Sequence, residues 1–128
     1  YAGRISRKRM TTILYGIPNC DQVKKARTWL DVHAVTYVFH DFKKAGINPN
    51  LIDTWLKDIA WDVLINRKGT TWRALPEQRK AAIIDATSAM ELMLESPSII
   101  KRPVLCSANR TQVGFSEELY QQVFKKNI

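Results

Sequence analysis

The chain has few residues of the kinds that define disulfide-rich, metal-binding or membrane proteins. Its 128 residues include only two cysteines, Cys20 and Cys106, and two histidines, His33 and His40. These residues show no metal-ligand spacing, and two distant cysteines are not the dense pattern of a secreted disulfide scaffold. No apolar run approaches the roughly 20 residues that span a bilayer. We therefore expect no bound metal or cofactor, no membrane partner and a reducing, cytoplasmic compartment.

Basic charge is in excess, with a formal net charge of +8. Residues 1–10 carry four of these charges, and the remaining basic residues are scattered among acidic ones instead of forming a stripe. This distribution does not favour a nucleic-acid partner. We expect residues 1–10 to be a basic leader that is disordered or foreign to the natural chain, with Met10 as a candidate start.

Residues 11–128 have the size and composition of one soluble domain, with 45% hydrophobic and 25% charged residues in the whole chain. "TTILY" (11–15) predicts a strand that ends in a turn at Gly16 and Pro18. A helical pattern begins at Asp21, and "VTYVFHDF" (35–42) is apolar on both faces, as in a covered strand. Together these segments predict a parallel strand–helix–strand unit.

A helical block of about residues 48–96 follows. Asn48 and Pro49 have the order of an N-cap and a first helical residue. We expect a loop over 66–75 and helices over 76–84 and 85–95. Because no Gly/Ser-rich linker borders the block, it is interpreted as an insertion within the same domain.

The carboxyl-terminal part is predicted to form a hairpin and a helix. Strands are expected over 101–106 and 111–115, joined by "SANR", with Ser116 as the cap of a last helix. The sequence therefore predicts an α/β fold with the order β-α-β, helices, β-β-α.

Cys20 lies where a strand-terminating turn meets a helix. The first backbone N–H groups of a helix have no partners within it, and the helix end carries partial positive charge, so a thiolate placed there is stabilised. Lys24 lies one turn further on and Arg27 extends the same face, so both add positive potential. The alternative is a cysteine that only fills space in the packing.

No second cysteine follows Cys20 at the C-x-x-C spacing, so a reactive thiol there needs an external thiol to resolve a mixed disulfide. Cys106 serves only if the fold brings it close, and the pattern favours a buried strand residue. In "KRPVL", Pro103 on its own suggests the start of a strand and Arg102 a solvated charge.

Three motifs in order, "ILYGIPNCDQVKKARTWL", "LINRKGT" and "IIKRPVL", resemble the arsenate reductase-like (ArsC/Spx) family, and are closest to its YffB branch. The resemblance extends from about Thr11 to Phe124. It implies a thioredoxin-like fold with a four-stranded mixed sheet and a helical insertion between the second and third strands.

The same resemblance implies the roles of individual residues. Cys20 matches the catalytic nucleophile, while Arg67 and Arg102 match arginines that hold an oxyanion. Pro103 matches a proline that the family keeps in the cis form and that faces the ligand. Lys24 stands where arsenate reductases have another arginine, and we expect it to share in anion binding.

The chain departs from the arsenate reductase pattern around the nucleophile. Gly16 stands in place of a histidine, Lys24 in place of an arginine, and a third oxyanion arginine would fall near Gly114. Because lysine offers one flexible charge where arginine offers a fixed fork of donors, this incomplete cradle argues against efficient arsenate reduction. It still suits a small anionic thiol such as glutathione.

We therefore hypothesise a glutathione-linked thiol oxidoreductase whose Cys20 is resolved by an external thiol, either glutathione or a glutaredoxin-type protein. Two alternatives stay open: a genuine glutathione- and glutaredoxin-dependent arsenate reductase, and a non-catalytic, partner-binding regulator of the Spx type. We expect a monomer.

Overall fold

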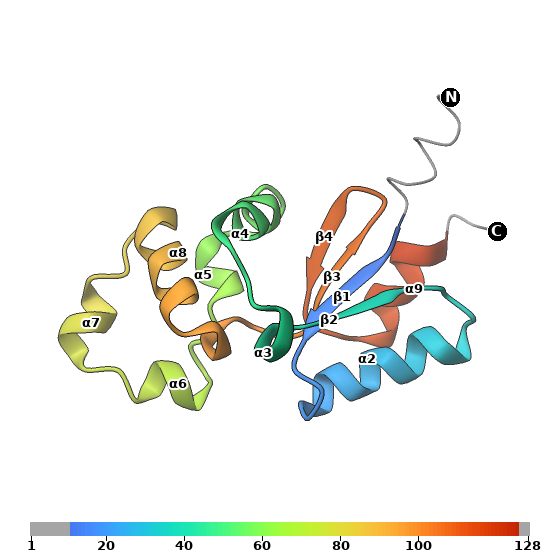
Figure 1. The fold of residues 1–128 in the computed structure, drawn as a ribbon, viewed down its shortest axis with the longest axis horizontal. Helices are drawn as coiled ribbons and strands as arrows, with labels where there is room; N and C mark the ends of the chain where they lie inside the picture. Colours follow the sequence, from blue (N-terminus) through green and yellow to red (C-terminus); the bar gives the residue numbers. More distant parts are fainter. Residues whose placement is uncertain (1–10, 126–128) are drawn as a thin grey trace. The chain divides into compact units, whose positions relative to one another are not determined.

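The computed structural model describes residues 11–125. The predicted leader, residues 1–10, lies outside this range. The chain divides into two compact units: one combines the segment up to Ala45 with the segment from Arg102, and the other is Gly46–Lys101 (Figure 1). The helical block is thus a unit of its own, a few residues longer at each end than the expected 48–96.

The first unit contains a four-stranded sheet in the order β2-β1-β3-β4. Its strands are β1 (Ile13–Gly16), β2 (Val38–Asp41), β3 (Val104–Ser107) and β4 (Arg110–Val113). Strand β1 runs parallel to β2 and antiparallel to β3, and β3 pairs antiparallel with β4. The predicted β-α-β and β-β-α orders and the mixed sheet are confirmed, and the fold is thioredoxin-like.

Two helices of this unit, α2 (Asp21–Val32) and α9 (Glu117–Phe124), cover the same face of the sheet. Their core combines apolar residues from both helices with central residues of β1 and β3: Leu14, Ala26, Trp29, Leu30, Leu105 and Tyr120. The expected cap of α9 is confirmed, because the Ser116 hydroxyl accepts a hydrogen bond from the Leu119 N–H at 3.0 Å. A short helix, α3 (Phe42–Ala45), follows β2.

Strand β2 is not the covered strand that its composition suggested. It lies at an edge of the sheet, and 56% of the surface of Val38 is exposed. Apolar residues on both faces reflect β-propensity here, which the sequence pattern alone does not distinguish from burial on both faces.

The β3–β4 hairpin turns through Ala108 and Asn109, whose φ angles are 53° and 65°. Two successive residues with positive φ are the requirement of the tight turns that match strand twist, and asparagine tolerates this conformation well. The predicted "SANR" connection is therefore confirmed.

The second unit is helical. Its helices are α4 (Pro49–Leu56), α5 (Trp61–Leu64), α6 (Thr70–Arg73), α7 (Glu77–Ala81), α8 (Ala86–Glu95) and the 3₁₀ turn η1 (Pro97–Ile99). Helix α8 contacts α4, α5 and η1, and the unit's buried side chains include Trp55, Leu64 and Met93. None of the described helices in either unit is long and apolar enough to span a membrane.

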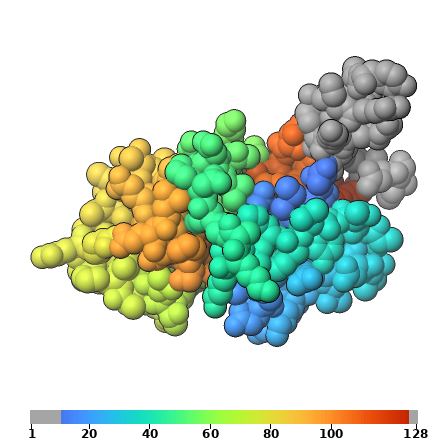
Figure 2. All heavy atoms as spheres, viewed as in Figure 1, coloured from blue at the N-terminus to red at the C-terminus, as the bar shows by residue number. Residues whose placement is uncertain are grey.

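In this unit the sequence predicts the start of α4 correctly, but it does not predict the short helices. Asn48 caps α4 by accepting a hydrogen bond from the Leu51 N–H at 2.9 Å, as expected. The expected 66–75 loop contains α6, and the helix expected over 76–84 is reduced to α7. Helix α7, coloured yellow in Figure 2, has no buried residue. The sequence therefore has no apolar stripe from which the length of this helix could be predicted.

Candidate active site

Cys20 occupies the N-cap position of α2, at the end of a tight turn that leaves β1. Its backbone N–H donates to the Ile17 carbonyl at 3.2 Å, and its own carbonyl accepts the first helical bond from the Lys24 N–H at 2.9 Å. The Cys20 side chain is half-buried and makes no capping hydrogen bond. The helix starts where it was predicted to start, and the Cys20 thiol does not cap it.

Gly16, the last residue of β1, explains how α2 comes so close to the strand. A Cβ atom built at this position would lie 2.7 Å from Cγ2 of Val23, which is fully buried on α2. Such a contact is too short unless the Val23 side chain or the backbone that carries it shifts. The packing of Val23 against this position thus disfavours a larger residue such as histidine.

The sheet register brings Pro103 to the same end of the sheet as the Cys20 turn. Tyr15 on β1 pairs with Val104 on β3, so Gly16 and Pro103 are the next residues at that edge. The peptide bond between Arg102 and Pro103 is cis, as the resemblance implied. Pro103 is buried and its carbonyl accepts a hydrogen bond from the Gly114 N–H at 2.8 Å.

Gly114 itself has a φ of 84°. This left-handed conformation favours glycine, and it disfavours an arginine at the position. The missing third oxyanion arginine and the missing histidine thus both coincide with positions that favour glycine, through backbone conformation at Gly114 and through packing against Val23 at Gly16.

Lys24 and Arg27 are the two cations of α2 that were expected to add positive potential at Cys20. Lys24 is exposed one turn from the thiol. Arg27, by contrast, donates from Nε to the Tyr37 hydroxyl at 3.2 Å and stacks its guanidinium 4.3 Å from the centre of the Phe39 ring. The Arg27 side chain thus ties α2 to the segment around β2, and its expected contribution to the positive potential at the thiol stays a prediction.

Arg67 belongs to the second unit, whereas the other expected site residues all belong to the first unit: Cys20, Lys24, Arg102 and Pro103. The Arg67 side chain lies 3.8 Å from the Asp62 carboxylate and 5.8 Å from the centre of the Trp61 ring. No sequence signal pointed to these two neighbours, because a helix end separates them from Arg67 and no regular spacing applies.

Cys106 lies in β3 and is half-buried, not fully buried as the pattern favoured. Its Sγ is 3.5 Å from the Thr111 hydroxyl. Burial, and to a lesser degree the charge of Cys106, raises the pKa of Tyr15 to about 12. Cys106 pairs with Ile13, three residues before the end of β1, which is about 10 Å along the strand from the Cys20 turn. The two thiols therefore stand toward opposite ends of β1.

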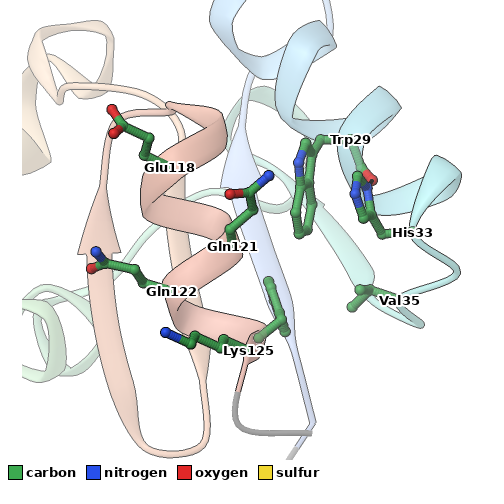
Figure 3. Close-up of a pocket in the computed structure, with 8 residues that line it drawn as sticks. Trp29, His33, Val35, Glu118, Gln121, Gln122 and Lys125 are labelled. Carbon is green, nitrogen blue, oxygen red and sulfur yellow. Dashed lines mark hydrogen bonds between the residues drawn. The ribbon is translucent and has the colours of Figure 1, made fainter. Parts of the chain in front are cut away.

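A groove runs between α2 and α9 on the flank of the first unit (Figure 3). It has a volume of about 730 Å³, and Trp29 on α2 and His33 at the C-cap of α2 line it opposite Gln121 on α9. The Nδ1–H of His33 donates to the Trp29 carbonyl at 2.9 Å, and the two rings stack 3.9 Å apart. A second hollow of about 800 Å³ shares both rings and also includes Lys24.

Of the residues expected in the site, Lys24 alone lines these two hollows. The reactive groups at the sheet edge, rather than the larger hollows, therefore define the candidate active site. Residues 11–125 contain no cluster of three or more histidine, cysteine or acidic side chains that would hold a metal ion.

Comparison with known proteins agrees with this geometry. A model of the ArsC family matches residues 15–123. A solved structure of a protein named YffB (PA3664) has 50% sequence identity and a TM-score of 0.83, covering 88% of this chain and 97% of its own. The solution structure of an arsenate reductase (ArsC) related protein from Brucella melitensis has 48% identity and a TM-score of 0.71, covering 91% and 96% of the two chains.

Among curated proteins, an uncharacterized protein of Haemophilus influenzae is 40% identical over 111 residues, which are 87% of this chain and 96% of that protein. Weaker matches include the global transcriptional regulator Spx of Streptococcus agalactiae, at 29% identity over 82% of this chain and 77% of the regulator.

Proposed function

The chain belongs to the ArsC family, and on that premise we propose that it is a glutathione-linked thiol oxidoreductase with Cys20 as its single nucleophile. The observation that carries the proposal is the meeting, at one sheet edge, of the Cys20 turn and the cis Arg102–Pro103 segment. The free half-buried thiol sits before the unpaired N–H groups of the first turn of α2, which favour an anion.

The reaction consists of two thiol–disulfide exchanges. The Cys20 thiolate attacks the glutathione sulfur of a mixed disulfide, the old S–S bond breaks, and the released thiolate takes a proton from water. A glutathione thiolate then attacks the glutathione sulfur on Cys20, which releases glutathione disulfide and regenerates the Cys20 thiolate. Two glutathione-derived sulfurs are thus joined in glutathione disulfide for each substrate disulfide reduced.

The resolving thiol comes from outside the chain in this proposal. Cys106 lies toward the other end of β1, and no cysteine follows Cys20 at the C-x-x-C spacing. Glutathione itself, or a glutaredoxin-type protein, completes the cycle. A chain with two free cysteines suits the reducing cytoplasm.

Lys24, Arg102 and Arg67 are assigned to the anionic groups of the substrate. Lys24 follows Cys20 on α2, and Arg102 directly precedes the cis proline at the same sheet edge. Pro103 is assigned to the face of the bound thiol ligand. The incomplete oxyanion cradle, with glycine at positions 16 and 114, favours a carboxylate-bearing thiol over arsenate.

Turnover of a glutathione mixed disulfide, coupled to glutathione reductase, tests the proposal. We expect turnover in the natural chain and in Cys106→Ser, and loss of at least about 100-fold in Cys20→Ser, since removal of the nucleophile removes the covalent step. Turnover that survives in Cys20→Ser contradicts the proposal.

A further inference from the structure

Two residues of helix α5 lie beside the Arg67 side chain. Its Nη2 atom lies 3.8 Å from Oδ2 of Asp62, and its guanidinium carbon lies 5.8 Å from the centre of the Trp61 ring. Half of the surface of each charged side chain remains exposed. The pair is therefore open to solvent, and other anions have access to the guanidinium.

The backbone beside Arg67 is fixed by hydrogen bonds within the second unit. The Asn66 N–H donates to the Ile99 carbonyl at 2.8 Å, and the Asn66 side-chain oxygen accepts from the Lys68 N–H at 3.2 Å. Gly69 completes the turn, and a Cβ there would come within 2.8 Å of the Asn66 amide. Asp62 and Trp61 are the side chains that lie beside the Arg67 guanidinium.

We propose that Asp62 is a specificity-determining residue, which occupies one edge of Arg67 and disfavours doubly charged oxyanions more strongly than singly charged carboxylates. The inference rests on the proposed function, in which Arg67 holds an anionic group of the substrate. An arginine has five N–H donors, so the edge away from Asp62 remains able to bind a second anion. That anion then experiences both the attraction of Arg67 and the repulsion of Asp62.

The size of the effect follows from Coulomb's law. A ligand charge about 7 Å from the Asp62 carboxylate in a water-like dielectric is repelled enough to weaken binding about two- to threefold. For a dianion the interaction energy doubles, so the weakening is the square of this factor, about four- to ninefold. Because both side chains are half-exposed, added salt reduces both factors.

The test is an anion titration of the whole protein, followed by the NMR signal of the Trp61 indole N–H. Acetate is the monoanion and sulfate the dianion, at constant ionic strength and about pH 7, with Trp61→Phe used to assign the signal. We expect Asp62→Asn to tighten sulfate binding about four- to ninefold and acetate binding about two- to threefold. Asp62→Glu restores the charge and should keep the natural selectivity.

Asp53→Asn is the matched control, because it removes the same charge from an exposed carboxylate on α4 of the same unit. It should leave both affinities unchanged. The inference is overturned if Asp62→Asn changes neither affinity, changes both by the same factor, or behaves like Asp53→Asn. Loss of folding in Asp62→Asn together with natural selectivity in a folded Asp62→Ser variant also overturns it.

The outcome is independent of the chemistry at Cys20, because the titration is repeated in Cys20→Ser. A selectivity change without turnover of mixed disulfides supports the role of Asp62 and rejects the proposed function. Turnover that requires Cys20, without any selectivity change in Asp62→Asn, rejects the role of Asp62 alone.

Discussion

The close approach of α2 to β1 makes Gly16 a sensitive position, and Gly16→Ala tests the packing that places Cys20. The new Cβ would lie 2.7 Å from Cγ2 of Val23, whose side chain is fully buried. Gly16 is not among the glycines with positive φ, so the substitution tests packing and not backbone conformation. Overpacking of this kind costs about 1–3 kcal/mol, and we expect Gly16→Ala to lower the free energy of unfolding by that amount.

A double-mutant cycle with Val23→Ala separates packing from other effects. Val23→Ala alone removes buried methyl groups and should cost about 2–3 kcal/mol. In the double variant, the methyl group that Gly16→Ala introduces takes space that the Val23 side chain has vacated. The double variant should therefore be at least as stable as Val23→Ala alone. If the two sites were independent, the costs of the two single substitutions would instead add.

Urea denaturation at about 25 °C, followed by circular dichroism, measures all four stabilities. Strict additivity of the two costs would refute the close contact. Glutathionylation of Cys20 gives a second readout, because Gly16→Ala pushes on the turn that carries the thiol and should slow the reaction, and the double variant should recover the natural rate.

Four further predictions concern helix capping, pH dependence, burial and substrate. Ser116→Ala removes the side-chain acceptor of the Leu119 N–H and should cost about 1 kcal/mol in thermal or urea unfolding. Hydrogen bonds from Ser88 hold the pKa of Asp85 below its usual value. The Asp85 carboxylate therefore stabilises the fold fully above the pKa that it has in the unfolded chain, and this stabilisation is lost as the pH falls through its pKa in the folded protein. Asp85→Ala should therefore reduce the loss of stability that the protein shows below about pH 4. Burial raises the pKa of Tyr120, whose hydroxyl has no hydrogen-bond partner in residues 11–125, so Tyr120→Phe should leave the melting temperature unchanged or raise it. Arsenate, supplied with glutathione and glutaredoxin, should be reduced no faster by the natural chain than by Cys20→Ser.

The sequence was most informative where a local signal has a single structural meaning. Gly16 and Pro18 before Cys20, the pair Asn48-Pro49, and Ser116 each marked the start of a helix that the structure contains. Such signals act through the backbone of a few neighbouring residues, so they do not depend on the rest of the fold.

Features that depend on tertiary packing were not predictable. The edge position of β2 depends on strand order, and the engagement of Arg27 with Tyr37 and Phe39 depends on how α2 packs beside that strand. The four-residue helices α5 and α6 are too short for a 3.6-residue pattern to emerge. The pairing of Arg67 with Asp62 could not be predicted either, because α5 is too short to show a regular spacing between them.

The resemblance supplied what the residues alone left open. A cis bond before Pro103 does not follow from the motif "KRPVL", since most bonds of this type are trans. The structure in turn explains a departure from the family pattern that the resemblance only recorded, because Val23 leaves no room for a side chain at Gly16.

Reaction of the whole protein with glutathione disulfide tests the central claim most directly, with intact mass and peptide mapping as readouts. We predict that one glutathione adds to Cys20 faster than to Cys106, that excess glutathione removes it, and that Cys106→Ser behaves like the natural chain. Modification of Cys106 at an equal or greater rate, or a Cys20 that reacts no faster than free cysteine, would contradict the assignment of Cys20 as the nucleophile.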